Sequence, residues 1–382
     1  MIGLRHLKII IAPDSFKGTL SAADAARAIA AGIRQIMPDA ILQLMPLADG
    51  GEGTLDAVLS ATQGVRYTAL VTDALDTPMS AVYGLLDDAN GPIAMLEAAQ
   101  VVGLTQAGKS DVMQRSTRGL GELIRYCLKY NVRRFMIGLG GSSTNDGGAG
   151  LLAALGVKWL DQTGKEITPT PQGLALLHRA DFSNLDARLA TTEITLMTDV
   201  DNPLCGPDGA TVIFGPQKGV RSEDVPILDA RLARLAQLCD AWAGQAVSHQ
   251  PGAGAAGGLG YALLLLGAKQ RPGAEVVCEL MQLDAALQEA GWVITGEGKS
   301  DAQTLHGKLP LVVAQHAKRA CVPVSLLSGA IEANSRTALE QTFNSCYALV
   351  GEGVSRAQAM HETARYLTER ARQMAQSMPG HG

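Results

Sequence analysis

The chain has 382 residues, of which 47% are hydrophobic and 18% are charged, and its formal net charge is −5. This composition is typical of a packed soluble enzyme and unlike that of a disordered chain, and the length favours two domains. The negative net charge provides no general basic field, so it argues against nucleic-acid and anionic-membrane partners, and any anionic ligand must be held by local groups.

The sequence predicts no export or membrane segment. The N-terminal stretch MIGLRHLKIIIAPD contains an apolar run that is too short for a signal-peptide core. No run of about twenty apolar residues occurs elsewhere. The six cysteines form no CxxC pair, which argues against a zinc ribbon and against a disulfide framework. We therefore expect a cytoplasmic protein with no membrane partner.

The N-terminal region predicts two units of strand, loop and helix. LKIIIA (7–12) is a strand that ends at the turn PDSFKGT. Ser21 and Asp24 have the spacing of a capping box before a one-faced helical series that Pro38 ends. ILQLMPL (41–47) is a second strand, followed by the loop ADGGEGT and a helix. This pattern is typical of a mostly parallel sheet.

The pattern changes after residue 64. The segments RYTALVTD, SAVYGLL and PIAMLEAA have little helical spacing between them, so we expect hairpin-type strands. The helix predicted around 119–130 and the strands RRFMIGL and EITLMTD then resume the alternating pattern. Towards the C-terminus, WVITGEG, VPVSLLSG and CYALVGEG form a series like the N-terminal one, with a final helix from about Ser355.

These elements predict an α/β fold with two domains. Residues 1–64 and 288–382 form a flavodoxin-like or Rossmann-like domain with a parallel sheet. Residues 65–287 form a second α/β domain that is inserted into the first and carries a glycine-rich loop. The prediction rests on the strand series at both chain ends and on the change of pattern near residue 64.

The glycine-rich loop GLGGSSTNDGGAG (138–150) contains six glycines between two apolar runs. Glycine is costly in conformational entropy, so the loop needs a compensating role. Free backbone N–H groups at a helix start bind phosphate, which predicts a nucleotide site, although close packing of a helix entry remains the alternative. Neither a P-loop nor a dinucleotide fingerprint is present. The candidate cofactor contacts are Gly140, Gly141, Ser142, Ser143, Thr144, Asn145, Asp146, Gly147 and Gly148.

Carboxylates recur in the loops that follow predicted strands. Singly, each is more often a turn former or a helix cap, but the recurrence favours a site. Phosphoryl transfer needs such groups to hold Mg²⁺ and to accept a proton, and needs lysines to neutralise charge. The acids are Asp14, Asp49, Glu52, Asp146, Asp199, Asp201, Glu297 and Asp301, and the lysines in comparable loops are Lys17, Lys218, Lys299 and Lys308.

Seven ordered motifs resemble those of the bacterial glycerate kinases of the first type. They are APDSFKGTLSA, PLADGGEGT, GLGGSSTNDGGAGLLAALG, DVDNPLCGPDGA, FGPQKG, PGAGAAGGLG and TGEGKSDAQTLHGKLP, and they extend from about Lys8 to the last helix. The resemblance implies ATP-dependent phosphorylation of D-glycerate with Mg²⁺, giving 2-phosphoglycerate. It also implies two α/β domains, one of them flavodoxin-like and built from both chain ends.

Individual roles follow from the chemistry of the residues. We expect Asp14 to orient or deprotonate the attacking hydroxyl and Lys17, five residues after the first strand, to hold the substrate carboxylate or the transferring phosphoryl group. The expected catalytic residues are Asp14, Lys17 and Asp199. The expected substrate contacts are Ser15, Lys17, Glu297, Asp301 and His306. The expected Mg²⁺ ligands are Asp49, Glu52 and Asp199.

Three alternatives stay open at this point. The nearest is a glycerate 3-kinase that gives 3-phosphoglycerate, because the motifs do not decide which hydroxyl reacts. A non-catalytic small-molecule binding protein would also use glycine-rich loops, but it would not need so many carboxylates beside lysines. A nicotinamide oxidoreductase is disfavoured because the dinucleotide fingerprint is missing. The sequence does not indicate the oligomeric state.

Overall fold

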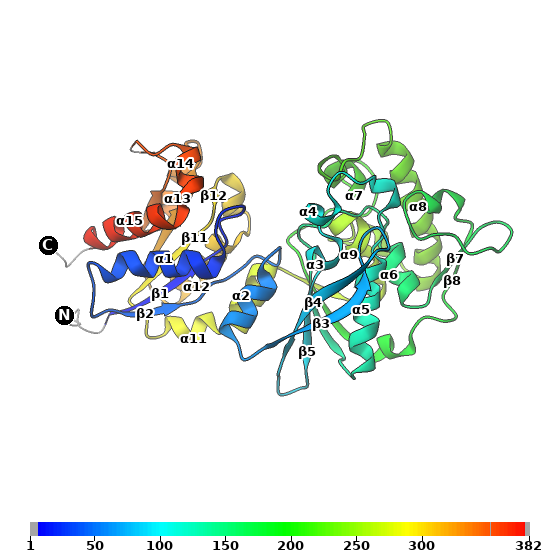
Figure 1. Cartoon of the computed structure of the whole chain (residues 1–382), viewed down its shortest axis with the longest axis horizontal. Coiled ribbons are helices and arrows are strands. Elements are labelled where there is room, and N and C mark those ends of the chain that lie inside the picture. Colours follow the sequence, from blue (N-terminus) through cyan, green and yellow to red (C-terminus); the bar gives the residue numbers. More distant parts are fainter. Residues whose placement is uncertain (1–6, 352, 379–382) are drawn as a thin grey trace. The chain divides into compact units, whose positions relative to one another are not determined.

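The computed structural model describes residues 7–351 and 353–378 (Figure 1). The chain forms two compact units, and both are of the predicted α/β class. The first unit combines both chain ends: Met1–Asp49, Asp56–Thr62 and Pro272–Gly382. The second consists of Gly50–Leu55 and Gln63–Arg271. Among the helices of the described residues, none has the length and apolar character needed to cross a bilayer.

The first unit is built on a five-stranded sheet in which all neighbouring strands are parallel. Its central strands read as continuous apolar runs because both faces of a parallel sheet are covered by helices. Ile9 pairs with Trp292 on one side and with Leu42 on the other. In spatial order the strands are β15 (Ser345–Ala348), β13 (Val324–Ser328), β11 (Trp292–Gly296), β1 (Lys8–Pro13) and β2 (Ile41–Leu44).

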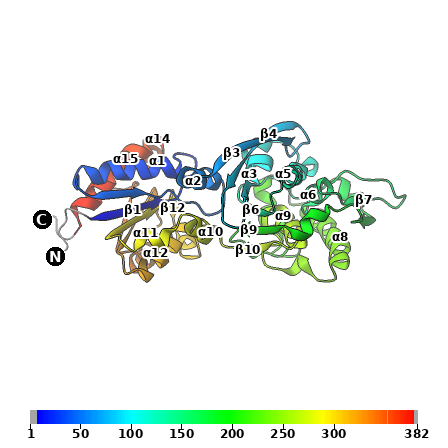
Figure 2. The same ribbon diagram turned by 90° about the horizontal axis from the view of Figure 1, so that it is seen from below.

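Helices cover both faces of this sheet: α1 and α15 lie on one face, and α11 and α12 on the other (Figure 2). The side chain of Ser21 accepts a hydrogen bond from Asp24 N, as the capping-box spacing predicts. Gly32 allows α1 to approach α15 closely, since a Cβ there would lie 2.2 Å from Thr368 O. The helices of this unit are α1 (Ala22–Arg34), α10 (Gly273–Leu280), α11 (Leu283–Leu287), α12 (Leu309–Arg319), α13 (Arg336–Thr342), α14 (Arg356–His361) and α15 (Thr363–Gln376), and α2 (Thr54–Ala61) has residues in both units.

The structure places α10 and α11 in the first unit, whereas the sequence-based boundary at 287/288 put them in the inserted domain. His316 on α12 links both helices to this unit, because its ring nitrogens lie 2.6 Å from Asp284 Oδ1 and 3.0 Å from Glu275 Oε2. These carboxylates come from α11 and α10. A short pair of parallel strands, β12 (Lys299–Ser300) and β14 (Ala330–Ile331), completes the unit.

The second unit has a six-stranded mixed sheet in which the hairpin-type strands are confirmed, since β3 pairs antiparallel with β4 and β4 with β5. The remaining neighbours are parallel. In spatial order the strands are β10 (Lys269–Arg271), β9 (Glu193–Met197), β6 (Arg134–Gly138), β5 (Ile93–Glu97), β4 (Pro78–Leu86) and β3 (Val65–Thr72). A separate antiparallel pair consists of β7 (Lys158–Leu160) and β8 (Arg179–Asp181).

The helices of the second unit bury its large apolar core. The predicted apolar face of α5 is confirmed, because Leu120, Leu123 and Ile124 are all fully buried. The helices are α3 (Ala99–Val102), α4 (Leu104–Ala107), α5 (Arg118–Lys129), α6 (Ala149–Ala154), α7 (Ala210–Phe214), α8 (Val225–Ala243) and α9 (Ala255–Leu265).

Candidate functional site

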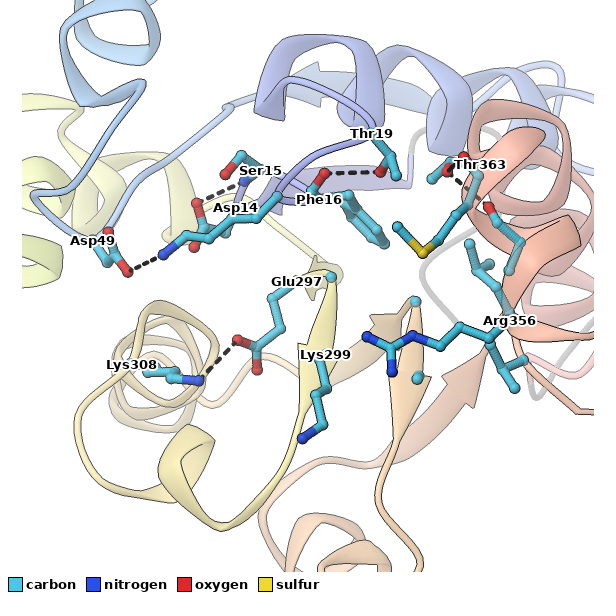
Figure 3. A pocket seen from close by; sticks show the side chains of 18 residues that line it. Asp14, Ser15, Phe16, Thr19, Asp49, Glu297, Lys299, Lys308, Arg356 and Thr363 are labelled. Carbon is cyan, nitrogen blue, oxygen red and sulfur yellow. Dashed lines mark hydrogen bonds and ion pairs between the residues drawn. The ribbon is translucent and has the colours of Figure 1, made fainter. Parts of the chain in front are cut away.

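A cavity of about 360 Å³ lies within the first unit (Figure 3). The loops that directly follow four parallel strands contribute to its wall, with Asp14 after β1, Glu297 after β11, Gly329 after β13 and Leu349 after β15. The carboxyl ends of parallel strands are where open α/β sheets bind ligands. The topology of this sheet therefore brings loops that are distant in sequence into one site.

Asp14 is the most perturbed acid of the cavity. It is buried, with 6% of its surface exposed, and its Oδ1 accepts a hydrogen bond of 2.6 Å from Ser15 N. Burial, reinforced by the negative charge of Asp49, raises the pKa of Asp14 to about 8. A carboxyl group that titrates near neutral pH is well matched to accepting a proton from a substrate hydroxyl.

Lys17 and Asp49 form an ion pair at the edge of the cavity. The Lys17 Nζ lies 3.6 Å from Asp49 Oδ2, and 71% of the lysine side chain is exposed. The charge of Asp49 raises the pKa of Lys17, so this lysine is cationic at neutral pH. A tight turn orients it, because Phe16 and Leu20 exchange backbone hydrogen bonds and Gly18 takes a φ of +79°.

Glu297 is held by hydroxyl groups from the loop that follows β11. Its Oε1 accepts hydrogen bonds from Ser300 Oγ at 2.9 Å and from Thr304 Oγ1 at 2.6 Å. Its Oε2 lies 3.8 Å from the Lys308 Nζ. Burial raises the pKa of Glu297. These contacts fix the carboxylate in one orientation at the cavity wall.

Asp301 and His306 lie beside this wall rather than in it. The Asp301 side chain caps the turn that follows it and lies 3.3 Å from the Lys299 Nζ and 3.8 Å from the Lys308 Nζ. His306 is exposed at the end of the same turn and does not line the cavity. Its role as a substrate contact stays a prediction.

The glycine-rich loop belongs to the second unit and joins β6 to α6. Gly140 and Gly141 are exposed, whereas residues 142–148 are buried. The Asp146 carboxylate accepts four hydrogen bonds, from Thr117 N and Oγ1 at 2.8 Å each and from Gly148 N and Gly150 N at 3.1 Å each. These two N–H groups at the start of α6 are therefore already used inside the protein. Burial raises the pKa of Asp146 despite these donors.

Lys218, from the motif FGPQKG, lies beneath this loop. Its Nζ donates to Thr144 O at 2.8 Å and to Ser142 Oγ at 3.2 Å. Arg115 Nη1 donates to Ser143 O and to Lys218 O, at 3.0 Å each. Burial lowers the pKa of Lys218 to about 7. Among the described residues, two buried side-chain atoms of the loop have no hydrogen-bond partner, Thr144 Oγ1 and Asn145 Oδ1.

A third motif, PGAGAAGGLG, packs against the same loop. Gly257 has a φ of +70°, and a Cβ there would lie 2.0 Å from Thr144 O. Gly147 N donates to Gly257 O at 3.0 Å. These glycines thus allow two backbones to touch. Three motifs that are far apart in the sequence form one buried network.

The proposed metal ligands are divided between the units. Asp49 lines the cavity of the first unit, whereas Glu52 and Asp199 are exposed residues of the second. Within the part of the chain that the structure describes, no three His, Cys, Asp or Glu side chains are grouped so as to hold a metal ion. Magnesium in phosphoryl-transfer sites is often held by only one or two carboxylates together with substrate phosphates. The carboxylate of Asp49, which lines the cavity, fits that requirement.

Sequence analysis missed one wall of the cavity. Arg356, Ala359, Met360 and Thr363 line it from α14 and the start of α15. Their spacing of three, four and seven residues is that of one helical face, which was the available signal. The residues predicted from the sequence lie in loops next to strands or at helix starts, and this helical face is not among them.

The comparisons with known proteins agree in naming one family. The model of the glycerate kinase family matches residues 9–379. The chain is 40% identical to a glycerate kinase of Bacillus subtilis (strain 168) over 97% of this chain and 98% of the relative. It is 43% identical to the glycerate 2-kinase of Escherichia coli (strain K12) over 85% and 86% of the two chains. The crystal structure of a protein assigned as glycerate kinase 2 from Salmonella typhimurium LT2 has a TM-score of 0.84 at 40% identity, over 97% of both chains.

Proposed function

The chain belongs to the glycerate kinase family, and from that premise we propose that it transfers the terminal phosphoryl group of ATP to the 2-hydroxyl of D-glycerate. The product is then 2-phosphoglycerate. The name of the Escherichia coli relative, glycerate 2-kinase, supports this choice of hydroxyl. The 3-hydroxyl is the alternative acceptor, and the two products differ only in where the phosphate is attached.

The observation that carries the proposal is the cavity of the first unit, where a buried acid lies close to an ion-paired lysine. Asp14, with a pKa of about 8, accepts the proton of the attacking hydroxyl. Lys17 supplies positive charge for the oxygens of the transferring phosphoryl group. Asp49 forms an ion pair with Lys17 and raises the pKa of Asp14, so its charge acts on both groups.

The donor set of the cavity also fits a magnesium ion. Asp49 offers hard carboxylate oxygens, which are the ligands that Mg²⁺ prefers. When bound, the ion would neutralise charge on the phosphate oxygens. Glu52 and Asp199 stay proposed ligands, and Asp199 a proposed catalytic residue. Of the proposed nucleotide loop, Gly140 and Gly141 have the exposed backbone that a phosphate contact needs.

Phosphorus NMR of a complete reaction tests this proposal. The purified chain is incubated with MgATP and D-glycerate, and ADP release is followed enzymatically. In a proton-coupled spectrum the 2-phosphate ester couples to a single carbon-bound proton and gives a doublet, whereas the 3-phosphate ester couples to a CH₂ group and gives a triplet. We expect the doublet and the loss of turnover with EDTA. A triplet would assign the 3-hydroxyl as the acceptor. If no phosphate ester formed in the presence of MgATP, kinase activity on D-glycerate would be contradicted.

A further inference from the structure

The cavity of the first unit is lined by three lysines and one arginine. Each lysine is ion-paired: Lys17 with Asp49, Lys299 with Asp301 and Glu332, and Lys308 with Glu297 and Asp301. Arg356 differs from them, because within residues 7–351 and 353–378 it has neither a hydrogen-bond nor an ion-pair partner. The cavity therefore contains one cation whose charge the described residues leave uncompensated.

The position of Arg356 directs its charged end into the cavity. It is the first residue of α14, and Met360, one helical turn later, lines the same wall. Figure 3 shows the guanidinium reaching from α14 towards the side of the cavity that holds Glu297 and Lys299. A guanidinium presents a planar set of N–H donors that matches a carboxylate or phosphate with two parallel hydrogen bonds.

We propose that Arg356 binds the carboxylate of the acceptor and thereby selects a hydroxy acid over an uncharged polyol. The inference rests on the proposed function, since it places the reacting hydroxyl at Asp14. In D-glycerate the 2-hydroxyl and the carboxylate are on neighbouring carbons, so both must enter the cavity that contains Asp14. The positive charge of each lysine is already offset by at least one carboxylate of the protein, whereas that of Arg356 is not offset by any described residue.

The sequence left two roles open for Lys17, binding of the substrate carboxylate and binding of the transferring phosphoryl group. This assignment gives the first role to Arg356 and the second to Lys17. Arg356 holds the carboxylate equally in the ground state and the transition state, so it contributes to the KM for glycerate. Lys17, beside Asp49 and Asp14, is left for the transferring phosphoryl group and contributes to kcat. A phosphate of the nucleotide is the competing occupant of Arg356, and it predicts a different kinetic result.

The test compares Arg356→Met and Arg356→Lys with the wild type. Met keeps an apolar stem without the charge, and Lys keeps the charge without the planar fork. For Arg356→Met we expect the KM for D-glycerate to rise about ten- to a hundredfold, with kcat and the KM for ATP nearly unchanged. Arg356→Lys should recover part of the loss. Arg336→Met is the matched control, because Arg336 pairs with Glu340 on its own helix and does not line the cavity.

An uncharged acceptor sharpens the test. The wild type should prefer D-glycerate to glyceramide, and Arg356→Met should lose most of that preference because only the charged acceptor uses the guanidinium. A rise in the KM for ATP instead would assign Arg356 to a nucleotide phosphate and overturn the proposal. Unchanged constants in all variants would also overturn it while leaving the kinase function intact. A wild type that does not phosphorylate D-glycerate would refute the proposed function, and this inference with it.

Discussion

The cavity of the first unit and the glycine-rich loop of the second unit use similar residue types but differ in structure. Both combine glycines, a carboxylate and a lysine in loops next to predicted strands. In the cavity, the lysine is largely exposed and the Asp14 carboxyl borders open space. In the loop, Asp146 and Lys218 are buried and bonded to neighbouring protein atoms. Polar glycine-containing motifs can thus either line a cavity or form hydrogen bonds inside the folded protein.

Hydrogen-bond satisfaction separates the two cases. Asp146 accepts four hydrogen bonds from the protein, which offset the cost of burying a carboxyl group. From the described residues Asp14 accepts one such bond, donated by Ser15 N, and its pKa is raised to about 8. An acid with little internal support has donor and acceptor capacity left for a substrate. The following experiments test whether this distinction holds.

Asp14→Asn should have the largest effect on activity. Removing the proton acceptor is expected to lower kcat by about 10²- to 10⁴-fold while the melting temperature stays close to that of the wild type. Only the ionised carboxylate accepts a proton, so kcat/KM of the wild type should rise with pH and level off above a pKa of about 8. Steady-state rates across pH measure both. A kcat near the wild-type value would remove Asp14 from the chemistry.

Asp146→Asn should chiefly affect stability. In the variant, the side-chain NH₂ group would replace one carboxylate oxygen and would face N–H or O–H groups that now donate to that oxygen. Buried donors without an acceptor are expected to lower the free energy of unfolding by about 3 kcal/mol or more. Urea denaturation measures this loss. Asp161→Asn is the control, because Asp161 accepts bonds from Thr163 N and Lys165 N in an exposed turn. If Asp146→Asn kept full stability and lost activity, the loop would be a catalytic element like the cavity.

Lys17→Met separates ground-state binding from transition-state stabilisation. With Arg356 holding the carboxylate, we expect kcat to fall by about ten- to a hundredfold and the KM for glycerate to change little. Steady-state kinetics measures both constants. Lys8→Met is the control variant, because Lys8 pairs with Glu289 outside the cavity. A rise in KM at constant kcat would return the carboxylate to Lys17, and no change in either constant would exclude Lys17 from the site.

Gly141→Ala tests whether the exposed end of the loop contacts ATP. Gly141 has a φ of +74°, and its Cβ would lie 3.3 Å from Ala99 Cβ. Gly164, with a φ of +84° and no atom within 4 Å of its Cβ, is the matched control. Both variants should lose about 1 kcal/mol of stability from backbone strain. Only Gly141→Ala should raise the KM for ATP, by about tenfold if one backbone hydrogen bond is lost. Equal KM values would favour the packing role for the whole loop.

Lys218→Met should produce the smallest effect, a change in how stability depends on pH. The pKa of Lys218 is lowered to about 7 by burial, from an ordinary value of 10.5. Between these values the unfolded chain binds more protons than the folded protein, so the stability of the wild type should rise with pH in this window. The difference in melting temperature between wild type and variant should therefore grow in favour of the wild type from about pH 7 to about pH 9. If the difference in melting temperature did not change with pH, Lys218 would be exposed to solvent and the glycine-rich loop would not be buried around it.

The local elements and the family could be predicted from the amino-acid sequence. Continuous apolar runs indicated β1 and β11, because buried parallel strands need no polar face. The Ser21 cap and the apolar face of α5 were also readable, since helix caps and helical faces depend on neighbours within a few residues. Ordered motifs along the chain identified the glycerate kinases, which the family comparison confirmed.

The sequence could not predict which polar loops border a cavity and which are buried and hydrogen-bonded inside the protein. That difference depends on contacts that form only in the folded chain. The partners that close the glycine-rich loop come from Thr117, Lys218 and Gly257, each distant in sequence, so no local pattern encodes the burial of Asp146. The pKa of Asp14 likewise depends on its burial by the folded sheet and on the charge of Asp49 from another loop. Arg356 reaches the cavity because the fold brings α14 beside loops that follow β1 and β11. Burial and charge pairing are properties of this assembled environment, since they arise from residues that meet only when the chain has folded.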